Sequence, residues 1–400
     1  MSKVAYLSGE MKKKSFAQIV QETESDLQRR LWAKMPEWEH VPGLRLPARL
    51  NVEQCSSSAT ARYKAEFAGR ILQEAGDGGP GRIADLTGGL GVDSWAFSLQ
   101  ADELLFNEMD AALCDLVRHN FACLGVPNAC FRSGEVRPGE VRAILAGFRP
   151  GLIYLDPARR SATGRKVFLL EDCSPDVAAL EAELLACAPQ LLAKLSPMAD
   201  LSLLRRRLRG VSEIHVVSVN GECKELLLRM EREEKEPFRL TVTELRDGQT
   251  HSLTLTDAQR KTGCEGLEGP IGEGWLFEPG AALMKSGGHE FLCRRGGLRK
   301  LSPSTQLYLA EEGPVGELAP FGRFRRILEA VPLDKRSLKD VGRRHPLADV
   351  SARNLPLHSD ELARRLGVSP GGDVHIYGTT VTTPAGSARV LLVTARQSFR

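Results

Sequence analysis

Short apolar runs alternate with amphipathic stretches along the chain from Arg82 to residue 196. The apolar runs predict strands at 82–87, 103–109, 128–134, 151–156 and 190–196, and the stretches between them predict helices near 92–100, 111–123, 139–148 and 176–188. Apolar strands that alternate with helices are typical of a parallel sheet covered on both faces. The pattern therefore predicts an α/β fold built on a Rossmann-like sheet.

The alternation stops in the stretch SEIHVVSVNGECKELLLRME, which predicts two strands joined at Asn220-Gly221, a strong turn signal. A parallel sheet closed by such a hairpin is typical of class I methyltransferases. A dinucleotide-dependent dehydrogenase is expected to continue with another crossover helix instead.

The flanking segments have different patterns, so we expect four regions. Residues 1–78 form an N-terminal helical region, in which Ser56–Ser58 are candidate N-caps of a helix that ends at Gly76. Residues 79–245 form the Rossmann-like domain. Residues 246–330 form a small α+β domain, and residues 331–400 form a second one with a helix at SDELARRLGV and strands at DVHIYGTTV and ARVLLVTAR.

Composition narrows the class of protein. The 400 residues are 42% hydrophobic and 26% charged, as expected of a soluble globular chain. No run of about 18 apolar residues predicts a membrane span, and the N-terminus lacks the apolar core of a secretory signal. The nine cysteines include no CxxC pair and no Cys/His cluster at zinc spacing, so we expect cytoplasmic free thiols and no structural metal. Nothing in the pattern specifies an oligomeric state.

Charge is distributed unevenly. The formal net charge is only +3, but the stretch from Arg323 to Arg400 holds 14 Lys and Arg residues against 7 Asp and Glu residues, an excess of +7. Such a bias fits contact with a polyanion such as RNA. A solvated surface whose acidic partners lie elsewhere in the fold explains the same count.

A glycine-rich segment, Asp85-Leu-Thr-Gly-Gly-Leu-Gly91, stands where the first strand meets the first helix. Glycine permits a tight turn and a close approach of backbone to ligand, and the following helix N-terminus suits a carboxylate. Gly-rich turns also occur for packing alone. The motif lies one residue from a GxGxxG/A fingerprint, so by itself it leaves NAD and S-adenosylmethionine (SAM) open, and the terminal hairpin favours SAM. The predicted cofactor-binding residues in this segment are Asp85, Thr87, Gly88, Gly89, Gly91 and Asp93.

A second part of the cofactor site is predicted about twenty residues later, in Asn107-Glu108-Met109-Asp110. A carboxylate at the end of the second strand can accept hydrogen bonds from both ribose hydroxyls, and an apolar neighbour can pack on adenine. We assign Glu108 to the ribose and Met109 to the adenine face. Asp110 is the alternative carboxylate if the strand ends later.

The fourth strand ends in Asp156-Pro157-Ala158-Arg159-Arg160, where residues of an open α/β sheet face the ligand crevice. Amino-methyltransferases with an Asp/Asn-Pro-Pro-aromatic motif use the carboxylate or amide and the first proline carbonyl to accept hydrogen bonds from the attacking amine. In this sequence no aromatic residue follows, so Arg159 or Arg160 would stack on a base or bind a phosphate. A strand terminator with surface arginines is the structural alternative. We predict catalytic roles for Asp156, Pro157 and Arg159.

Three further residues are candidates for a catalytic role. Lys194, in Lys194-Leu-Ser196-Pro197 after the fifth strand, would pair with Asp156 or with substrate, or else lie in solvent. Cys173 and Cys223 would serve a covalent route, but neither stands in a recognisable nucleophile motif, and free cysteines are more often buried small residues. We include Lys194 among the catalytic residues and leave the cysteines out.

Seven blocks carry a resemblance to a known family: QCSSS (54–58), ARYK (61–64), DLTGGLGVDS (85–94), NEMD (107–110), LDPARRS (155–161), KLSP (194–197) and GECKELLL (221–228). They resemble a Bacteroidetes-type group of bacterial class I SAM-dependent methyltransferases with a C-terminal THUMP-like domain. Residues 275–288 look like the group's ferredoxin-like segment, and residues 341–357 and 372–381 resemble its THUMP-like part. DLTGGLGVDS is also similar to the motif of small-subunit rRNA guanine-N2 methyltransferases.

The resemblance implies SAM as methyl donor, with Asp85, Gly88, Gly89, Gly91 and Glu108 at matching cofactor positions. It also implies an RNA substrate, because THUMP domains are RNA-binding modules in tRNA-modifying enzymes. Our hypothesis is an RNA base methyltransferase that acts on an exocyclic amine of tRNA or rRNA. The alternatives are a methyltransferase for a protein or small molecule, whose C-terminal domains form a pocket or a dimer contact, and a non-catalytic RNA-binding protein.

Overall fold

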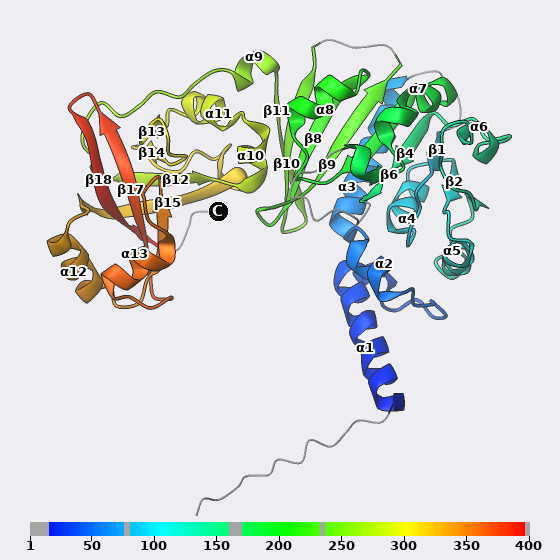
Figure 1. Cartoon of the computed structure of the whole chain (residues 1–400), viewed down its shortest axis with the longest axis horizontal. Coiled ribbons are helices and arrows are strands. Elements are labelled where there is room, and N and C mark those ends of the chain that lie inside the picture. The colour runs from blue at the N-terminus through cyan, green and yellow to red at the C-terminus, as the bar shows by residue number, and fades with distance from the viewer. Residues whose placement is uncertain (1–15, 76–80, 160–169, 233–236, 397–400) are drawn as a thin grey trace, which may run out of the picture. The chain divides into compact units, whose positions relative to one another are not determined.

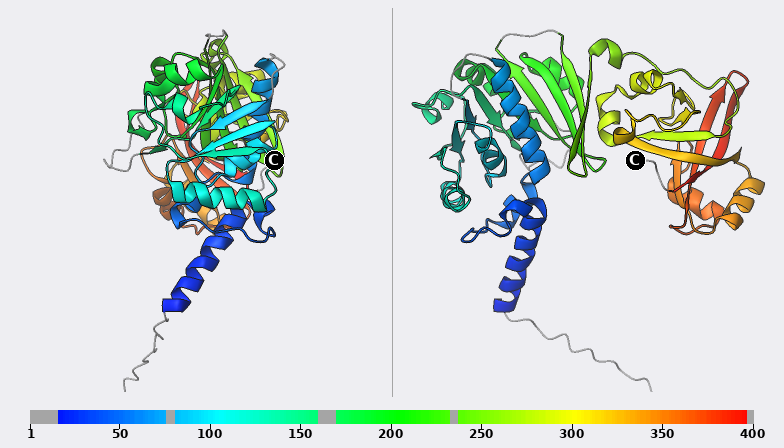
Figure 2. Two further views of the ribbon diagram at one scale, coloured as in Figure 1. Left: turned by 90° about the vertical axis from the view of Figure 1, so that its right-hand side faces the viewer. Right: turned by 180° about the vertical axis from the view of Figure 1, so that it is seen from behind.

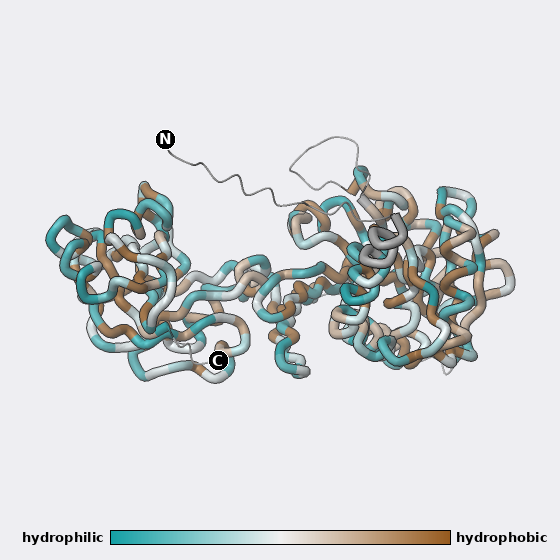
Figure 3. The backbone as a smooth tube through the Cα atoms, turned by 90° about the horizontal axis from the view of Figure 1, so that it is seen from below, coloured by the Kyte–Doolittle hydropathy of each residue, from teal (hydrophilic) through white to brown (hydrophobic). Residues whose placement is uncertain are grey.

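The computed structural model describes residues 16–75, 81–159, 170–232 and 237–396. The chain divides into two compact units, Met1–Asp156 with Ala182–Pro189, and Pro157–Glu181 with Gln190–Arg400 (Figure 1). In each unit the apolar residues gather in the interior and polar residues follow the outer loops (Figure 3).

The first unit begins with helices, as the sequence predicts for this region. Helix α3 contacts α4 and β4 and buries one face, which includes Ala61, Phe67, Ala68 and Ile71. It runs along the strands of this unit (Figure 2). The N-terminal elements are α1 (Phe16–Lys34), a 3-10 turn (Pro36–Trp38), α2 (Arg49–Gln54) and α3 (Ser58–Ala75).

The four strands of the first unit are parallel and have the order β4-β1-β2-β3. The interior positions of β1, β2 and β4 are fully buried apolar residues, as expected of central strands, whereas β3 is an edge strand and is only half-buried. The carboxyl ends of β1, β2 and β4 therefore meet at one edge. The elements are β1 (Arg82–Asp85), α4 (Val92–Ser98), β2 (Glu103–Asn107), α5 (Ala111–Cys123), β3 (Ala129–Arg132), α6 (Val141–Ile144) and β4 (Leu152–Leu155). All four strands and all three helices match predicted ones.

The predicted hairpin is present in the second unit. Strand β9 lies between β7 and β8 and is antiparallel to both, and Asn220 and Gly221 form the turn with positive φ angles of 51° and 84°. The elements from residue 158 to residue 231 are β5 (Ala158–Arg159), a 3-10 turn (Leu170–Asp172), β6 (Cys173–Ser174), α7 (Val177–Cys187), β7 (Gln190–Leu195), α8 (Leu201–Arg207), β8 (Val211–Val219) and β9 (Glu222–Glu231). They belong to the second unit, except that α7 from Ala182 on belongs to the first.

The sheet of the second unit continues beyond residue 245, where the sequence analysis places a domain boundary. Strand β10 (Arg239–Arg246) pairs in parallel with β8, and β11 (Gln249–Leu255) pairs antiparallel with β10. The alternating runs LTVTEL (240–245) and HSLTLT (251–256) predict both strands. Alternation does not specify which neighbour a strand joins, so the boundary could not be derived from it.

A second sheet of seven strands follows, in the order β13-β14-β12-β15-β18-β17-β16. Strand β15 crosses the boundary that the sequence analysis places after residue 330. The elements are α9 (Asp257–Arg260), β12 (Gly274–Pro279), α10 (Ala281–Ser286), α11 (His289–Arg295), β13 (Arg299–Lys300), β14 (Tyr308–Ala310), a 3-10 turn (Ala319–Phe321), β15 (Gly322–Pro332), α12 (Lys335–Arg344), β16 (Asp349–Arg353), α13 (Ser359–Leu366), β17 (Val374–Thr383) and β18 (Gly386–Ala395).

Both faces of this second sheet are covered. Ile376 belongs to a cluster that includes Val341 of α12 and Leu362 of α13, whereas the next residue, Tyr377, belongs to a cluster with Leu276 of β12. Neighbouring residues of a strand point to opposite faces, so the two clusters are separate cores. Helices α12 and α13 lie together over one of them (Figure 1).

Candidate functional site

The glycine-rich loop joins the end of β1 to the start of α4. Gly89 and Gly91 have φ angles of +54° and +79°, a region that favours glycine. A Cβ at Gly88 would lie 2.1 Å from the ring of Phe106, and one at Gly91 would lie 2.7 Å from Val117. The loop thus packs closely on β2 and α5, and only glycine permits this path.

The buried carboxyl of Asp85 connects the two ends of this loop. Its carboxyl accepts hydrogen bonds from the Thr87 backbone N–H (3.0 Å) and the Ser94 hydroxyl (2.5 Å), so it ties the start of the loop to α4. Asp85 is 1% exposed, and burial raises its pKa to about 8, with the nearby carboxylates of Asp93 and Asp156 adding to the rise. This carboxyl shapes the loop and is buried below its surface.

Glu108 follows β2 and is bonded to the loop. One carboxylate oxygen accepts the Gly89 N–H at 2.9 Å, and the other accepts the Asp110 N–H at 3.0 Å. The Asp110 carboxylate caps α5 by accepting the N–H groups of Ala112 and Leu113. Glu108 is thus bonded to the glycine-rich loop, whereas the Asp110 carboxylate is engaged in the helix cap. Met109 is 64% exposed.

Asp156 lies directly after β4 and is half-buried. Its backbone N–H donates to the hydroxyl of Thr87 at 2.6 Å, which bonds the Asp-Pro motif to the glycine-rich loop. Pro157 is also half-buried, and Ala158 and Arg159 form β5, which pairs with Ser174 and Cys173 of β6. Arg160 lies outside the described residues.

Asp93 takes part in a buried cluster that the sequence analysis did not foresee. The Asp93 carboxylate lies 3.2 Å from Nζ of Lys64 and accepts hydrogen bonds from the hydroxyls of Ser56 (3.1 Å) and Tyr154 (2.8 Å). Lys64 is fully buried in α3. A lysine within an otherwise small and apolar helical face is the one signal in the sequence that could have pointed to this pair, because a buried lysine requires a counter-charge.

The remaining candidates lie in the second unit. Lys194 is half-buried near the end of β7, opposite Leu227 of β9. Cys173 is buried on β6, and burial raises the pKa of the half-buried Cys223 to about 11. A thiol with a raised pKa is a poor nucleophile at neutral pH, which agrees with leaving Cys223 out of the site.

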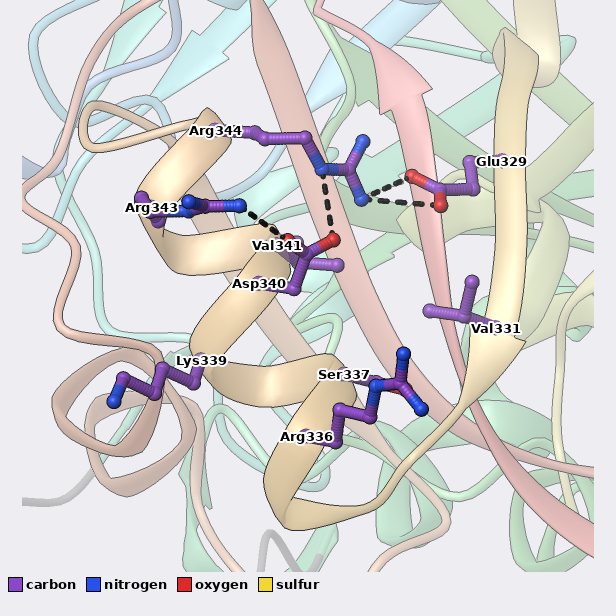
Figure 4. A pocket seen from close by; sticks show the side chains of 9 residues that line it. All are labelled: Glu329, Val331, Arg336, Ser337, Lys339, Asp340, Val341, Arg343 and Arg344. Atoms are coloured by element: carbon purple, nitrogen blue, oxygen red, sulfur yellow. Dashed lines mark hydrogen bonds and ion pairs between the residues drawn. The ribbon is translucent and has the colours of Figure 1, made fainter.

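A groove of about 430 Å³ lies between α12 and β15 in the second unit (Figure 4). Arg344 forms ion pairs with Glu329 and Asp340, and Arg343 pairs with Asp340. Of the described residues, none forms an ion pair with Arg336 or Lys339. The groove therefore keeps an excess of positive charge. Its lining residues are Glu329, Val331, Arg336, Ser337, Lys339, Asp340, Val341, Arg343 and Arg344.

Three further features bear on the candidate chemistry. All nine cysteines are free thiols. Across the part of the chain that the structure describes, no group of three or more His, Cys, Asp or Glu side chains could hold a metal ion. None of the helices in the described ranges has the length and apolar character needed to cross a membrane.

Comparison with solved structures finds a methyltransferase from Porphyromonas gingivalis W83 that is 31% identical, with a TM-score of 0.81, over 98% of this chain and 94% of that one. An rRNA methylase from Streptococcus thermophilus is 11% identical over 42% of this chain and 93% of its own, with a TM-score of 0.31. An RNA methyltransferase from Pyrococcus horikoshii is 12% identical over 52% of this chain and 98% of its own, with a TM-score of 0.32.

Family models match the C-terminal part of the chain. Residues 275–314 match a ferredoxin-like domain, and residues 322–396 match a THUMP domain-like family. No curated protein sequence matches the chain. The Porphyromonas relative matches nearly the whole of both chains, and the two domain matches fall in the predicted order. The chain therefore belongs to the family of class I SAM-dependent methyltransferases that carry a C-terminal THUMP-like domain.

Proposed function

We propose that this enzyme transfers the methyl group of SAM to an exocyclic amine of a base in a structured RNA, either tRNA or rRNA. One observation carries the proposal: the Asp156 N–H donates a hydrogen bond to the Thr87 hydroxyl, so the Asp-Pro motif is directly joined to the glycine-rich loop. A methyl transfer needs the acceptor group within reach of the donor, and this bond holds the two parts of the site together.

The residues of the first unit fit SAM. At Gly89 of the glycine-rich loop the position of a Cβ is open, with the Thr87 carbonyl oxygen 4.0 Å away, so ligand atoms can approach the backbone there. The Glu108 carboxylate would accept the ribose hydroxyls, and the exposed Met109 would pack on adenine. When bound, SAM supplies a methyl group on a sulfonium, which is an electrophile that needs no metal-bound intermediate.

The Asp156-Pro157 pair fits an amine acceptor. The Asp156 carboxylate and the Pro157 carbonyl are hydrogen-bond acceptors, and together they would accept hydrogen bonds from the two N–H groups of the attacking amine and orient its lone pair. The surplus proton of the methylated nitrogen then passes to water. The role of Arg159 in this proposal is to stack its guanidinium plane on the base or to bind a phosphate.

The RNA part of the proposal draws on the second unit. Residues 322–396 match the THUMP domain-like family, and Arg336 and Lys339 line the groove beside α12 with their charges uncompensated. Phosphates of an RNA backbone are the ligands that such a groove would attract. The excess of +7 between Arg323 and Arg400 has the same sign.

The test is methyl transfer from radiolabelled SAM to RNA isolated from a strain in which the gene is deleted, so that the target site is unmodified. Protein and small-molecule fractions of the same strain are assayed in parallel. We expect label in RNA with the wild type. For Asp156→Ala, which removes the hydrogen-bond acceptor, we expect a loss of about 10²- to 10⁴-fold in rate with little change in affinity for S-adenosylhomocysteine. Asp115→Ala, at an exposed aspartate on α5, is the matched control and should retain wild-type activity.

Each outcome separates a part of the proposal. Label in the protein or small-molecule fraction, and none in RNA, would overturn the RNA substrate and leave the methyltransferase. Full activity of Asp156→Ala would remove this residue from catalysis. Absence of S-adenosylhomocysteine binding by the wild type in calorimetry would contradict the cofactor site itself.

A further inference from the structure

A buried ion pair joins the N-terminal helix α3 to α4, the helix that follows the glycine-rich loop. Lys64 of α3 is 0% exposed, its Nζ lies 3.2 Å from the Asp93 carboxylate, and it donates to the Ser56 hydroxyl at 3.0 Å. The Ser56 hydroxyl in turn donates to Asp93 at 3.1 Å. Asp93 stands in the first turn of α4, two residues after Gly91. The pair therefore holds the helix that begins where the glycine-rich loop ends.

The same carboxylate reaches the strand that carries Asp156. The Tyr154 hydroxyl donates to Asp93 at 2.8 Å, and the Tyr154 ring packs on Phe97 of α4 with the centroids 4.8 Å apart. Tyr154 stands two residues before Asp156 on β4. The hydrogen bond from the Asp156 N–H to the Thr87 hydroxyl connects the end of the same strand to the glycine-rich loop. Strand end, loop and helix thus form a closed ring of contacts, with Lys64 attached to it from outside the sheet.

We propose that Lys64, Asp93 and Tyr154 are positioning residues, which together hold the cofactor loop and Asp156 in the relative geometry that methyl transfer requires. This rests on the proposed function of Asp156. It gives Asp93 a role different from direct contact with the cofactor, because its carboxylate already accepts Ser56 and Tyr154 and pairs with Lys64.

Burial explains why a lysine is needed at this place. Asp85 and Asp93 are 1% and 8% exposed and lie on either side of the loop. An ionised carboxylate that is buried without a partner is costly, and removal of one member of a buried ion pair leaves the other uncompensated. Lys64 supplies the counter-charge to Asp93, and it does so from a helix that is not part of the Rossmann-like sheet.

The test compares four variants for S-adenosylhomocysteine affinity, thermal unfolding and, with the RNA substrate, kcat and the KM for SAM. Tyr154→Phe removes one hydroxyl and keeps the ring, and Lys64→Met removes the charge. The double variant Lys64→Met/Asp93→Asn removes both charges. Arg70→Met, an exposed basic residue on the same helix, is the control. Hydrogen exchange of the Thr87–Gly91 and Asp156 amides is measured for each.

We expect Tyr154→Phe to weaken S-adenosylhomocysteine binding about tenfold, to lower kcat about tenfold, and to speed exchange of the Asp156 amide, with a smaller loss of Tm than Lys64→Met causes. The double variant should regain much of the Tm lost by Lys64→Met while its affinity stays about tenfold weak. Wild-type affinity and amide exchange in Tyr154→Phe and in the double variant would overturn the proposal and leave a purely structural ion pair. Affinity and exchange need no substrate, so they test this inference even where the wild type methylates no RNA.

Discussion

The carboxylate of Glu108, at the end of β2, accepts a hydrogen bond from the backbone N–H of Gly89 at a distance of 2.9 Å. This bond joins two segments that are 19 residues apart in the chain and that both contribute to the candidate cofactor site. A carboxylate can accept further hydrogen bonds while it keeps this one, so Glu108 is held in place for a ligand with hydroxyl groups.

Glu108→Gln should therefore weaken S-adenosylhomocysteine binding by about 10- to 100-fold, since hydrogen bonds to a charged group are worth about 1.5–3 kcal/mol. Isothermal titration calorimetry measures the effect. Asp110→Ala is the contrasting variant: it removes the cap of α5, costs about 1 kcal/mol of stability, and should leave the affinity unchanged. The opposite pattern would transfer the ribose contact to Asp110.

Gly91→Ala should lower the free energy of unfolding by about 2–5 kcal/mol, because the new methyl group meets Val117 at a residue whose φ is +79°. Gly125→Ala is the matched control, with a φ of +69° and no atom within 4 Å of the added Cβ, and should cost about 1 kcal/mol. Urea unfolding of the two variants gives the difference. Equal losses would mean that backbone strain alone, and not the close packing of the loop on α5, makes glycine necessary.

Stability should depend on pH through Asp85. Its folded pKa of about 8 is above the ordinary value of 3.8, so the folded state binds the proton more tightly than the unfolded state does. The stabilisation is complete below pH 3.8 and is lost as pH rises toward and through 8. Between pH 6.5 and 8 the wild type should lose about 1.5 kcal/mol relative to Asp85→Asn.

That pH window avoids the opposite effect of His375, whose pKa is lowered by burial to about 4 and whose titration raises stability between pH 4 and 6.5. Urea unfolding at closely spaced pH values gives the two curves. A constant difference between wild type and Asp85→Asn from pH 6.5 to 8 would show that the Asp85 pKa is not raised.

Gly342→Ala should destabilise the THUMP-like domain, although alanine usually stabilises a helix interior by about 1 kcal/mol. The added Cβ would lie 1.8 Å from the carbonyl oxygen of Leu366, so α12 and α13 must separate, at a cost of about 1–3 kcal/mol. Lys335→Ala on the exposed face of α12 should change stability by less than about 0.5 kcal/mol. A gain in Tm for Gly342→Ala would contradict the close packing of the two helices.

The groove beside α12 should contribute to RNA affinity in a salt-dependent way. For the double variant Arg336→Gln/Lys339→Gln, the slope of log affinity against log salt should become shallower by about 1 to 2, as expected for the loss of one or two phosphate contacts. Filter binding between about 50 and 200 mM salt measures the slope. Arg365→Gln, whose guanidinium is already paired with Glu361, is the control, and an equal change in both variants would exclude a specific contribution of the groove.

The Rossmann-like core was predictable because its signals are local. Runs such as Leu152–Leu155 are apolar throughout, helix α5 was predicted with its observed bounds, and Asn220-Gly221 adopts the positive φ angles that its hairpin requires. Helix α12 was not predicted. Its apolar stripe is short: Leu338 and Val341 contact the core, and charged residues make up most of the rest of the helix, so the run has too few apolar positions to show the helical period.

The sequence by itself determined the α/β class, the position of the glycine-rich loop, and the residues at the ends of β2 and β4, because each depends on neighbours in the chain. Tertiary structure decided the bond between Glu108 and Gly89, the bond between Thr87 and Asp156, and the burial of Lys64 against Asp93. These relationships join residues up to 69 positions apart. Only the packing of helices and strands determines such distances, so no local pattern could specify them.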